Sequence, residues 1–571
     1  MHCHTSVLGR RHANVFQDSR IRPARRAARH PRASEGARRT QVRAAPADSP
    51  LPAETDYVVI GSGFGGLCCA ALLAKYGNSV TVLESHYLPG GCAHSFEHEG
   101  YTFEAGPSFH AGLSAPFGRS SNPVRAVLDY VGETVPSITY DEWIAYLPEG
   151  QQMHIRPDAR AYAREIERLA GPTAANEWRA LERELLPLGD AAAGLPAAAL
   201  RYDVGIVRTA ATLDPLELLK SGLSASKLTG PFSALVDKHV SNPWLRKVLD
   251  LECFLLSGLT AKDTILAEMA FMFSERHSGK STIDYPVGGT AAMIDALVRG
   301  LENHGGELRL RSHVEEIVVD GGRATGVKVR GSKGGFVRAR KAVISNATTW
   351  DTQRLLPSTA TSAGQVAAWS RECKAVPPLP SFVHLHLGIS GEGLSDDLLI
   401  HHLAVEDMNK ELDDDRNVVN ISIPSVLDKE CAPDGKHAVH VYCAANEDYA
   451  VWEGLKPSSG EYKALKRERS DKLYAALERV IPDVRSRVEV ELIGTPLTHE
   501  RFTRRHRGTY GPAQSMGLPG AKTPIEGLLV CGDSTQPGVG VPAAAASGML
   551  AANTLSPVDK QLDLIETLRR G

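Results

Sequence analysis

Tyr57-Val58-Val59-Ile60-Gly61-Ser62-Gly63-Phe64-Gly65-Gly66 is the stretch that decides the fold of this 571-residue chain. An apolar run enters a GxGxxG turn, and the next apolar run, Ser79-Val80-Thr81-Val82-Leu83, ends at Glu84. This order predicts a strand, a tight turn, a helix and a second strand, the βαβ unit that binds dinucleotides. The chain is therefore expected to have an α/β fold with a Rossmann-type domain.

The glycines of this turn have separate mechanical roles. Gly61 permits the tight turn, Gly63 lets the backbone approach a pyrophosphate, and Gly66 lets the helix pack closely on the strand. The N-terminus of that helix then faces the anion. Glu84 follows Gly61 by 23 residues, a spacing that suits a carboxylate accepting from ribose hydroxyls. The motif alone does not separate FAD from NAD.

Residues 1–50 differ in composition from the rest of the chain. They hold eleven arginines, no lysine and three acids, a net charge of +8. Such an Arg-rich, acid-poor N-terminus is typical of a transit peptide to a plastid or mitochondrion. A basic arm for nucleic acid is the alternative, but lysine and interleaved aromatic residues are missing. Since the whole chain carries −3, the remainder carries −11, so nucleic acid is not an expected partner.

The nine cysteines are scattered, with no CxxC pair and no His/Cys pairing at zinc spacing. We expect mostly buried thiols in a reducing compartment, and no metal site. No run of 18 or more apolar residues occurs, so a spanning helix is not expected. Attachment to a membrane surface remains open.

Beyond residue 112 the pattern is mainly helical up to about residue 279, with examples at 174–186 and 245–273. The apolar clusters 254–256 and 269–273 predict either buried helix faces or the lining of a lipophilic pocket. Three β-rich runs between 381 and 445 follow. Polar residues such as His384 and His386 alternate with apolar ones there, which predicts a half-exposed antiparallel sheet.

The last motif runs from the apolar strand 528–531 into Gly532-Asp533 and a small-residue helix. Gly532 lets the chain turn close to a ligand, and Asp533 suits hydroxyls of a ribityl chain. Pro542 fits the first turn of the helix, where its missing N–H costs nothing. The helix N-terminus would face the flavin edge where negative charge gathers on reduction.

Several motifs resemble, in the same order, those of the phytoene desaturase superfamily, with the carotenoid isomerase branch the closest match. They are the N-terminal fingerprint, Pro89-Gly90-Gly91, Gly100-Tyr101-Thr102-Phe103-Glu104, His313-Val314-Glu315-Glu316-Ile317, Arg507-Gly508-Thr509-Tyr510-Gly511-Pro512 and Gly532-Asp533-Ser534 to Ser547-Gly548. The resemblance spans roughly residues 55–555. The sequence departs from well-studied isomerases at Pro107-Ser108-Phe109-His110, and its Pro-Gly-Val-Gly-Val-Pro turn resembles an isomerase-like subgroup, so the substrate stays open.

The resemblance implies FAD, held by a glutathione-reductase-like Rossmann domain with an inserted α+β substrate domain. Val314 would meet the adenine through its backbone, Asp533 the ribityl-phosphate region, and Val541 and Pro542 the isoalloxazine. The implied cofactor-binding residues are Gly61, Gly63, Gly65, Gly66, Glu84, Gly90, Gly91, Val314, Gly532, Asp533, Gly540, Val541 and Pro542.

The expected domain division follows the same resemblance. The FAD-binding domain is discontinuous and comprises residues 51–115, 280–350 and 520–556. The substrate and membrane-facing domain comprises 116–279 and 351–519. Residues 557–571 form a C-terminal tail, and residues 1–50 the transit peptide.

The implied activity is carotenoid biosynthesis in the plastid, by cis-trans isomerisation of a polyene double bond. Reduced flavin can transiently add charge to a C=C bond and lower its rotation barrier, whereas oxidised flavin removes hydride. With no Ser/His/Asp constellation and no metal set, the cofactor is expected to do the chemistry. Glu104 is the acid/base candidate, although it could only hold backbone amides. His110 could protonate or stack, or be a hydrogen-bonded loop residue.

Other functions remain open. They are a carotenoid desaturase or saturase, an amine oxidase, and a flavin- or pigment-binding assembly factor without turnover. No second GxGxxG occurs, so electrons would come from a quinone, oxygen or an external reductant. The expected partners are a lipophilic polyene and a peripheral thylakoid or envelope surface. The basic run 504–507 is either a solvated edge or a site for lipid phosphates or the flavin diphosphate.

Overall fold

The computed structural model describes residues 50–570, apart from 194–195, 214–226, 278, 280–281, 332–334, 362–363 and 515–516. The expected transit peptide at 1–50 therefore lies outside the described residues, except for Pro50. Among the described residues, none of the helices combines the length and apolar character needed to cross a bilayer.

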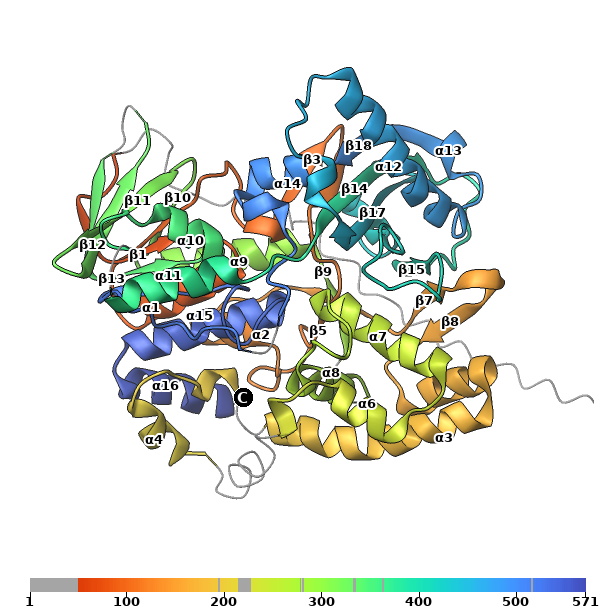
Figure 1. The fold of residues 1–571 in the computed structure, drawn as a ribbon, viewed down its shortest axis with the longest axis horizontal. Helices are drawn as coiled ribbons and strands as arrows, with labels where there is room; N and C mark the ends of the chain where they lie inside the picture. Colours follow the sequence, from red (N-terminus) through yellow and green to blue (C-terminus); the bar gives the residue numbers. More distant parts are fainter. Residues whose placement is uncertain are drawn as a thin grey trace, which may run out of the picture. The chain divides into compact units, whose positions relative to one another are not determined.

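The predicted βαβ unit opens a seven-stranded sheet, in which β1 pairs in parallel with β2 and β13 (Figure 1). The strand order is β10-β2-β1-β13-β12-β11, and β19 pairs with β13. The strands are β1 (Glu54–Ile60), β2 (Val80–Leu83), β10 (Glu307–Arg309), β11 (Val314–Asp320), β12 (Arg323–Val329), β13 (Phe336–Ser345) and β19 (Leu528–Val530). The carboxyl ends of β1, β2, β13 and β19 meet at one edge, where ligands of such sheets bind.

Helices cover both faces of this sheet. Tyr57 and Val59 of β1 pack with α1, α2, α9 and α15, whereas Val58 and Ile60 pack with residues of α11. Because β1 is buried on both sides, it reads as a continuous apolar run. The helices are α1 (Phe64–Lys75), α2 (Pro123–Val131), α9 (Thr290–Asn303), α10 (Thr349–Leu355), α11 (Gly364–Ala375), α15 (Val541–Leu555) and α16 (Val558–Arg569). The expected tail at 557–571 thus includes helix α16.

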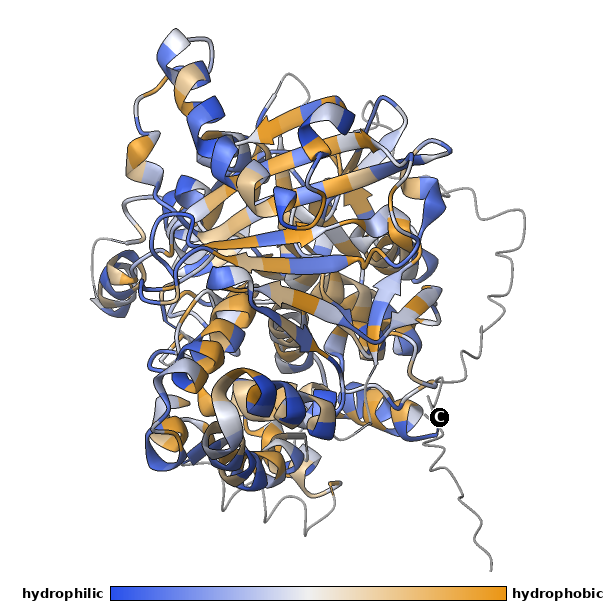
Figure 2. Ribbon diagram, turned by 90° about the vertical axis from the view of Figure 1, so that its right-hand side faces the viewer, coloured by the Kyte–Doolittle hydropathy of each residue, from blue (hydrophilic) through white to orange (hydrophobic). Residues whose placement is uncertain are grey.

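A second seven-stranded sheet has the order β18-β14-β17-β16-β15-β7-β8. Its strands are β7 (Trp143–Tyr146), β8 (Gln152–Ile155), β14 (Ser381–Ser390), β15 (His401–Val405), β16 (Val418–Ser422), β17 (Lys436–Glu447) and β18 (Val488–Gly494). In Figure 2 the strands are largely hydrophobic, with polar interruptions.

The prediction that this sheet is half-exposed is wrong. The alternation is real, since Leu385 and Leu387 face α12 (Gly460–Glu478) while His384 and His386 face the other way. However, both histidines are buried. The second face is covered by the hairpin β3 (Ser95–His98) and β4 (Tyr101–Glu104), whose aromatic rings contact His386. A polar face is thus buried because a hairpin distant in sequence packs on it.

The helical region is divided more finely than predicted. The run 245–273 forms two helices, α7 (Pro243–Ser257) and α8 (Leu266–His277), because Gly258 ends α7 in the left-handed conformation with φ 73°. The other elements are α3 (Ala159–Ala193), α4 (Gly205–Ala210), α6 (Ser233–His239), α13 (Val484–Arg487), α14 (Pro496–Thr503), and a small sheet of β5 (His110–Ala111), β9 (Ile283–Pro286) and β6 (Ser137–Tyr140). All eight described cysteines are free thiols, and all but Cys92 are buried, as predicted.

Candidate active site

A cavity of about 1550 Å³ extends from the carboxyl end of β1 to helices α7 and α8. Its wall includes Gly63 at the start of α1, Asp533 after β19 and Phe271 on α8. Ligand pockets usually measure roughly 300–1,000 Å³. The cavity therefore has room for a dinucleotide and for a second ligand beside it.

The structure gathers the predicted cofactor residues around this cavity. Those that line it are Gly61, Gly63, Gly65, Glu84, Gly90, Gly91, Val314, Gly532, Asp533, Gly540, Val541 and Pro542. Gly66 instead faces the sheet, where a Cβ atom would lie 2.3 Å from the Gly61 carbonyl oxygen. Because Gly66 has no side chain, α1 can pack closely on β1.

Asn346 is a residue of this site that the sequence analysis missed. It follows β13 directly, and a Cβ atom on Gly63 would lie 2.8 Å from its Nδ2 atom. A Cβ atom on Gly65 would lie 2.7 Å from its Oδ1 atom and 2.8 Å from the Gly532 nitrogen. The sequence could have indicated Asn346, because this residue directly follows the apolar strand that pairs with β1. The glycines thus keep open a narrow cradle at the crossing of two strand ends.

Two helix N-termini line the cavity. Gly63 precedes α1 and Gly540 precedes α15, and neither residue caps its helix with a side chain. The first N–H groups of a helix have no partner within the helix, and they carry partial positive charge. The two ends are therefore suited to a pyrophosphate and to an electron-rich ring edge.

Glu84 is held at the end of β2 by its own neighbours. Its Oε2 atom accepts from the Ser62 nitrogen at 2.9 Å and hydroxyl at 2.7 Å, and Oε1 accepts from the His86 nitrogen at 2.8 Å. A carboxylate offers about four acceptor positions. The Ser85 hydroxyl, 3.4 Å from Oε1, is a fourth donor, so a ribose hydroxyl would replace or share this weak bond.

Asp533 is paired with Arg505, whose Nη2 atom lies 2.8 Å from Oδ2. Arg505 also donates to the carbonyl oxygens of Thr509 and Tyr510. Burial disfavours the guanidinium charge, but Asp533, together with Cys92, more than offsets this and raises the pKa of Arg505. The basic run is therefore not one solvated edge: the Arg505 side chain is only 13% exposed and is paired at the site, whereas Arg507 is exposed beside Glu453.

We expect Asp533→Ala to bind FAD about ten- to hundredfold more weakly, because a charged hydrogen-bonding group is lost at the cofactor wall. Asp533→Asn should bind FAD with intermediate affinity, since it keeps the shape but not the charge. Flavin absorbance per protein after gel filtration measures this. Asp396→Asn, an exposed carboxylate far along the chain, is the control. Normal flavin content in Asp533→Ala would contradict the expectation.

Glu104 and His110 meet at Thr290, the first residue of α9. The Oε1 atom of Glu104 accepts from the Thr290 nitrogen at 2.7 Å and hydroxyl at 2.8 Å, and burial raises the pKa of Glu104. Glu104 does not line the cavity, so its geometry matches the alternative in which it holds a backbone amide. His110 does line it and lies 3.0 Å from the Thr290 hydroxyl. Burial lowers the pKa of His110 to about 4, so it is neutral at pH 7.

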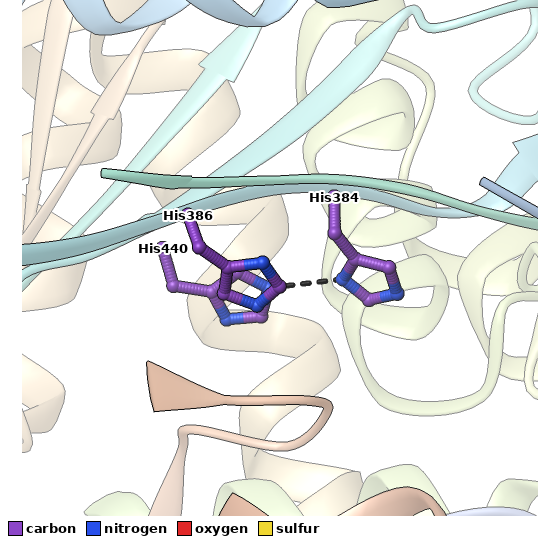
Figure 3. A group of neighbouring side chains, drawn as sticks. All are labelled: His384, His386 and His440. Carbon is purple, nitrogen blue, oxygen red and sulfur yellow. Dashed lines mark hydrogen bonds between the residues drawn. The ribbon is translucent and has the colours of Figure 1, made fainter. Parts of the chain in front are cut away.

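His384, His386 and His440 form a buried cluster next to Glu104, whose carbonyl oxygen lies 2.9 Å from the His386 Nε2 atom (Figure 3). One ring nitrogen of each lies within 4.8 Å of the others. However, His384 and His440 share a 2.9 Å hydrogen bond, and His386 stacks on His440 with ring planes 8° apart. Lone pairs of parallel rings do not converge on one ion. The geometry is therefore that of a packed stack of neutral imidazoles.

Helices α7 and α8 contribute apolar side chains to the cavity wall, beside the ionisable residues Glu252, Glu268 and Arg276. Leu255 and Leu256 of α7 and Phe271 and Met272 of α8 face the cavity, whereas Phe273 lies in the core. The clusters 254–256 and 269–273 thus contain both residues that line the pocket and residues of the core, on different faces of the same helices. The lined space is suited to a lipophilic ligand.

Comparison with known proteins identifies relatives that match most of the chain. Residues 64–556 match the family described as flavin containing amine oxidoreductase. The chain is 32% identical to a chloroplastic prolycopene isomerase of Arabidopsis thaliana, over 88% of this chain and 82% of that protein. It is 27% identical to an all-trans-retinol 13,14-reductase of Danio rerio, over 85% and 83%. A solved putrescine oxidase covers 87% of this chain and 98% of its own, with a TM-score of 0.57 at 16% identity, which shows the shared fold.

Proposed function

Because the chain belongs to the flavin-containing amine oxidoreductase family, we propose that it is an FAD-dependent, carotenoid isomerase-like enzyme that converts cis double bonds of a polyene to trans. One observation carries this proposal: the cavity continues from the dinucleotide cradle into the apolar wall of α7 and α8. A polyene lying along that wall would reach the cofactor. The identity to a prolycopene isomerase supports the same substrate class.

FAD fits the residues present. The cradle beside Asn346 has no room for side chains, and the oriented carboxylate of Glu84 lines the same cavity. When bound, reduced FAD supplies electron density that lowers the order of a nearby C=C bond, and oxidised FAD accepts hydride. The glycine cradle would hold the pyrophosphate, and the Arg505–Asp533 pair would orient the ribityl chain. The walls of α7 and α8 would exclude water from the polyene.

Saturase or desaturase activity is the second candidate, favoured by the likeness to a retinol reductase. In that case a quinone is a proposed electron partner. We also propose a plastid location, supported by the chloroplastic relatives, and contact with a membrane surface as the source of the lipophilic substrate. The two-domain division remains a proposal, supported by the strands of the first sheet falling in 51–115, 280–350 and 520–556.

The test is anaerobic incubation of the FAD-loaded full chain with a panel of cis-carotenes, with and without dithionite. Chromatography and mass spectrometry read the geometry and mass of the products. We expect a mass-neutral cis-to-trans change that requires reduced flavin. A two-hydrogen change would instead establish a saturase or desaturase. Bound but unchanged pigment would favour an assembly factor without turnover.

A further inference from the structure

Glu268 places a carboxyl group in the cavity wall without a protein partner. It lies in the first turn of α8 and lines the cavity. In the described part of the chain, its side chain makes no hydrogen bond or ion pair. Burial raises the pKa of Glu268 to about 8, and no other group contributes to that shift. The carboxyl is therefore mainly neutral at pH 7 and carries a proton into the cavity.

The surroundings of Glu268 locate it at the cofactor end of the cavity. Tyr510 lies within electrostatic range of Glu268 as well as of Tyr442 and Asp533. Tyr510 lies close to the end of α7, since a Cβ atom on Gly258 would be 3.3 Å from its ring. The same end of α7 reaches α15, because the Leu256 carbonyl oxygen lies 3.8 Å from a Cβ atom built on Gly540. Glu268 thus belongs to the region where α15 begins.

The same wall holds a second carboxyl, that of Glu252, which has protein partners. Glu252 on α7 also lines the cavity, but Arg276 of α8 lies 2.8 Å from it and Tyr162 donates to it at 2.9 Å. Glu268 has no such cation. Positions three and four residues further along α8, Phe271 and Met272, are apolar and line the cavity on the same side. The chain therefore presents an unpaired, proton-bearing carboxyl at the start of an apolar surface.

An unpaired polar group at an apolar surface lowers the stability of the protein. A carotene offers no nitrogen or oxygen acceptor, but its π electrons can take up a proton from such a group. We propose that Glu268 is the general acid of the reaction and transfers its proton to a carbon of the polyene; this inference rests on the proposed function. A group with a pKa near the working pH is suited to give and recover a proton.

The step involves no net electron transfer, and the reduced FAD that the proposed function requires would stabilise the positive charge created by protonation. The O–H bond of Glu268 breaks, and a C–H bond forms at one end of the substrate C=C bond, using its π electron pair. Positive charge then spreads along the polyene, and the former double bond rotates as a single bond. The same carbon returns the proton to the Glu268 carboxylate and the double bond reforms. The substrate changes geometry but not composition.

The test compares wild type with Glu268→Gln and Glu268→Asp, and with Asp396→Asn as the surface control, all as FAD-loaded full chains. Glu268→Gln keeps the size of the side chain but not the acid. We expect its kcat to fall about 100-fold or more, with KM and flavin content close to wild type. Glu268→Asp should recover part of kcat. Wild-type kcat should fall as the pH rises through about 8, because the donor must be protonated.

Infrared difference spectroscopy gives a readout that needs no turnover. At pH 7 wild type should show a protonated carboxyl band that is absent from Glu268→Gln and that shifts when a cis-carotene binds. Undiminished kcat in Glu268→Gln, an effect on KM alone, or absence of the band would each overturn the inference. If wild type isomerises no polyene, the proposed function fails, while the band and its shift still decide whether Glu268 meets the ligand as an acid.

Discussion

Acidification from about pH 6.5 towards pH 4 should unfold this protein in a steep transition. The cause is a set of buried imidazoles that fold in the neutral form. Desolvation lowers the pKa of His94, His110, His386 and His402 to about 4 and that of His499 to about 3, and it places those of His384, His401 and His440 well below the ordinary value.

The direction follows from proton linkage. In the unfolded chain these groups regain a pKa near about 6.5 and take up protons that the folded chain cannot hold. Their contribution is fully present above the unfolded pKa and is lost as the pH falls towards the folded values. Each proton bound only by the unfolded state changes stability by about 1.4 kcal/mol per pH unit. Eight such groups would give roughly 11 kcal/mol per pH unit, from which Glu268 and Glu447 subtract about one proton each because burial raises their pKa values to about 8 and about 7 in the folded chain. The remaining slope, roughly 8 kcal/mol per pH unit, is comparable to the whole stability of a typical protein, about 5–15 kcal/mol.

Urea titrations at a series of pH values, followed by circular dichroism, measure this slope. A His384→Phe/His440→Phe double variant removes both partners of one hydrogen bond and keeps the ring shapes, so it should fold and lose about two protons from the slope. His98→Gln should leave the slope unchanged, since His98 is 43% exposed. Stability that stays level between pH 7 and pH 5 would show that these histidines are protonated in the folded state.

Gly66→Ala should abolish FAD retention, and turnover with it. The added Cβ atom would lie 2.3 Å from the Gly61 carbonyl oxygen and 3.1 Å from the Asn346 Cβ atom. Both neighbours belong to strand ends that form the cradle, so relief requires α1 to move away from β1. Overpacking of this kind costs about 1–3 kcal/mol or more. The same shift would displace the helix N-terminus from the pyrophosphate.

The ratio of flavin to protein after purification, with a thermal melt of the apoprotein, measures both effects. Gly460→Ala is the matched control, because nothing lies within 4 Å of a Cβ atom at that helix start. It should keep full flavin content and an unchanged melting temperature. A Gly66→Ala variant with bound flavin at the wild-type ratio would mean that α1 tolerates the displacement.

The elements that could be predicted from the sequence are those whose conformation depends on neighbouring residues. The turn at Gly61 and the helix that follows depend on steric freedom within a few residues, and α9 and α12 follow from apolar periodicity and nearby helix ends. The positions of Glu84, Gly91 and Asp533 at one cavity were also predictable, because each of these residues lies in or next to a recognisable strand or glycine motif.

The sequence by itself determined the βαβ unit, the strand and helix at the C-terminal motif, and the acid that ends β2, because these depend on neighbouring residues. Only the tertiary structure decided what each polar group meets. It buried His384 and His386 under a hairpin almost 300 residues earlier in the chain, joined Arg505 to Asp533, and left Glu268 without a partner. Burial and pairing are properties of packing between distant segments, so residue type and spacing do not encode them locally.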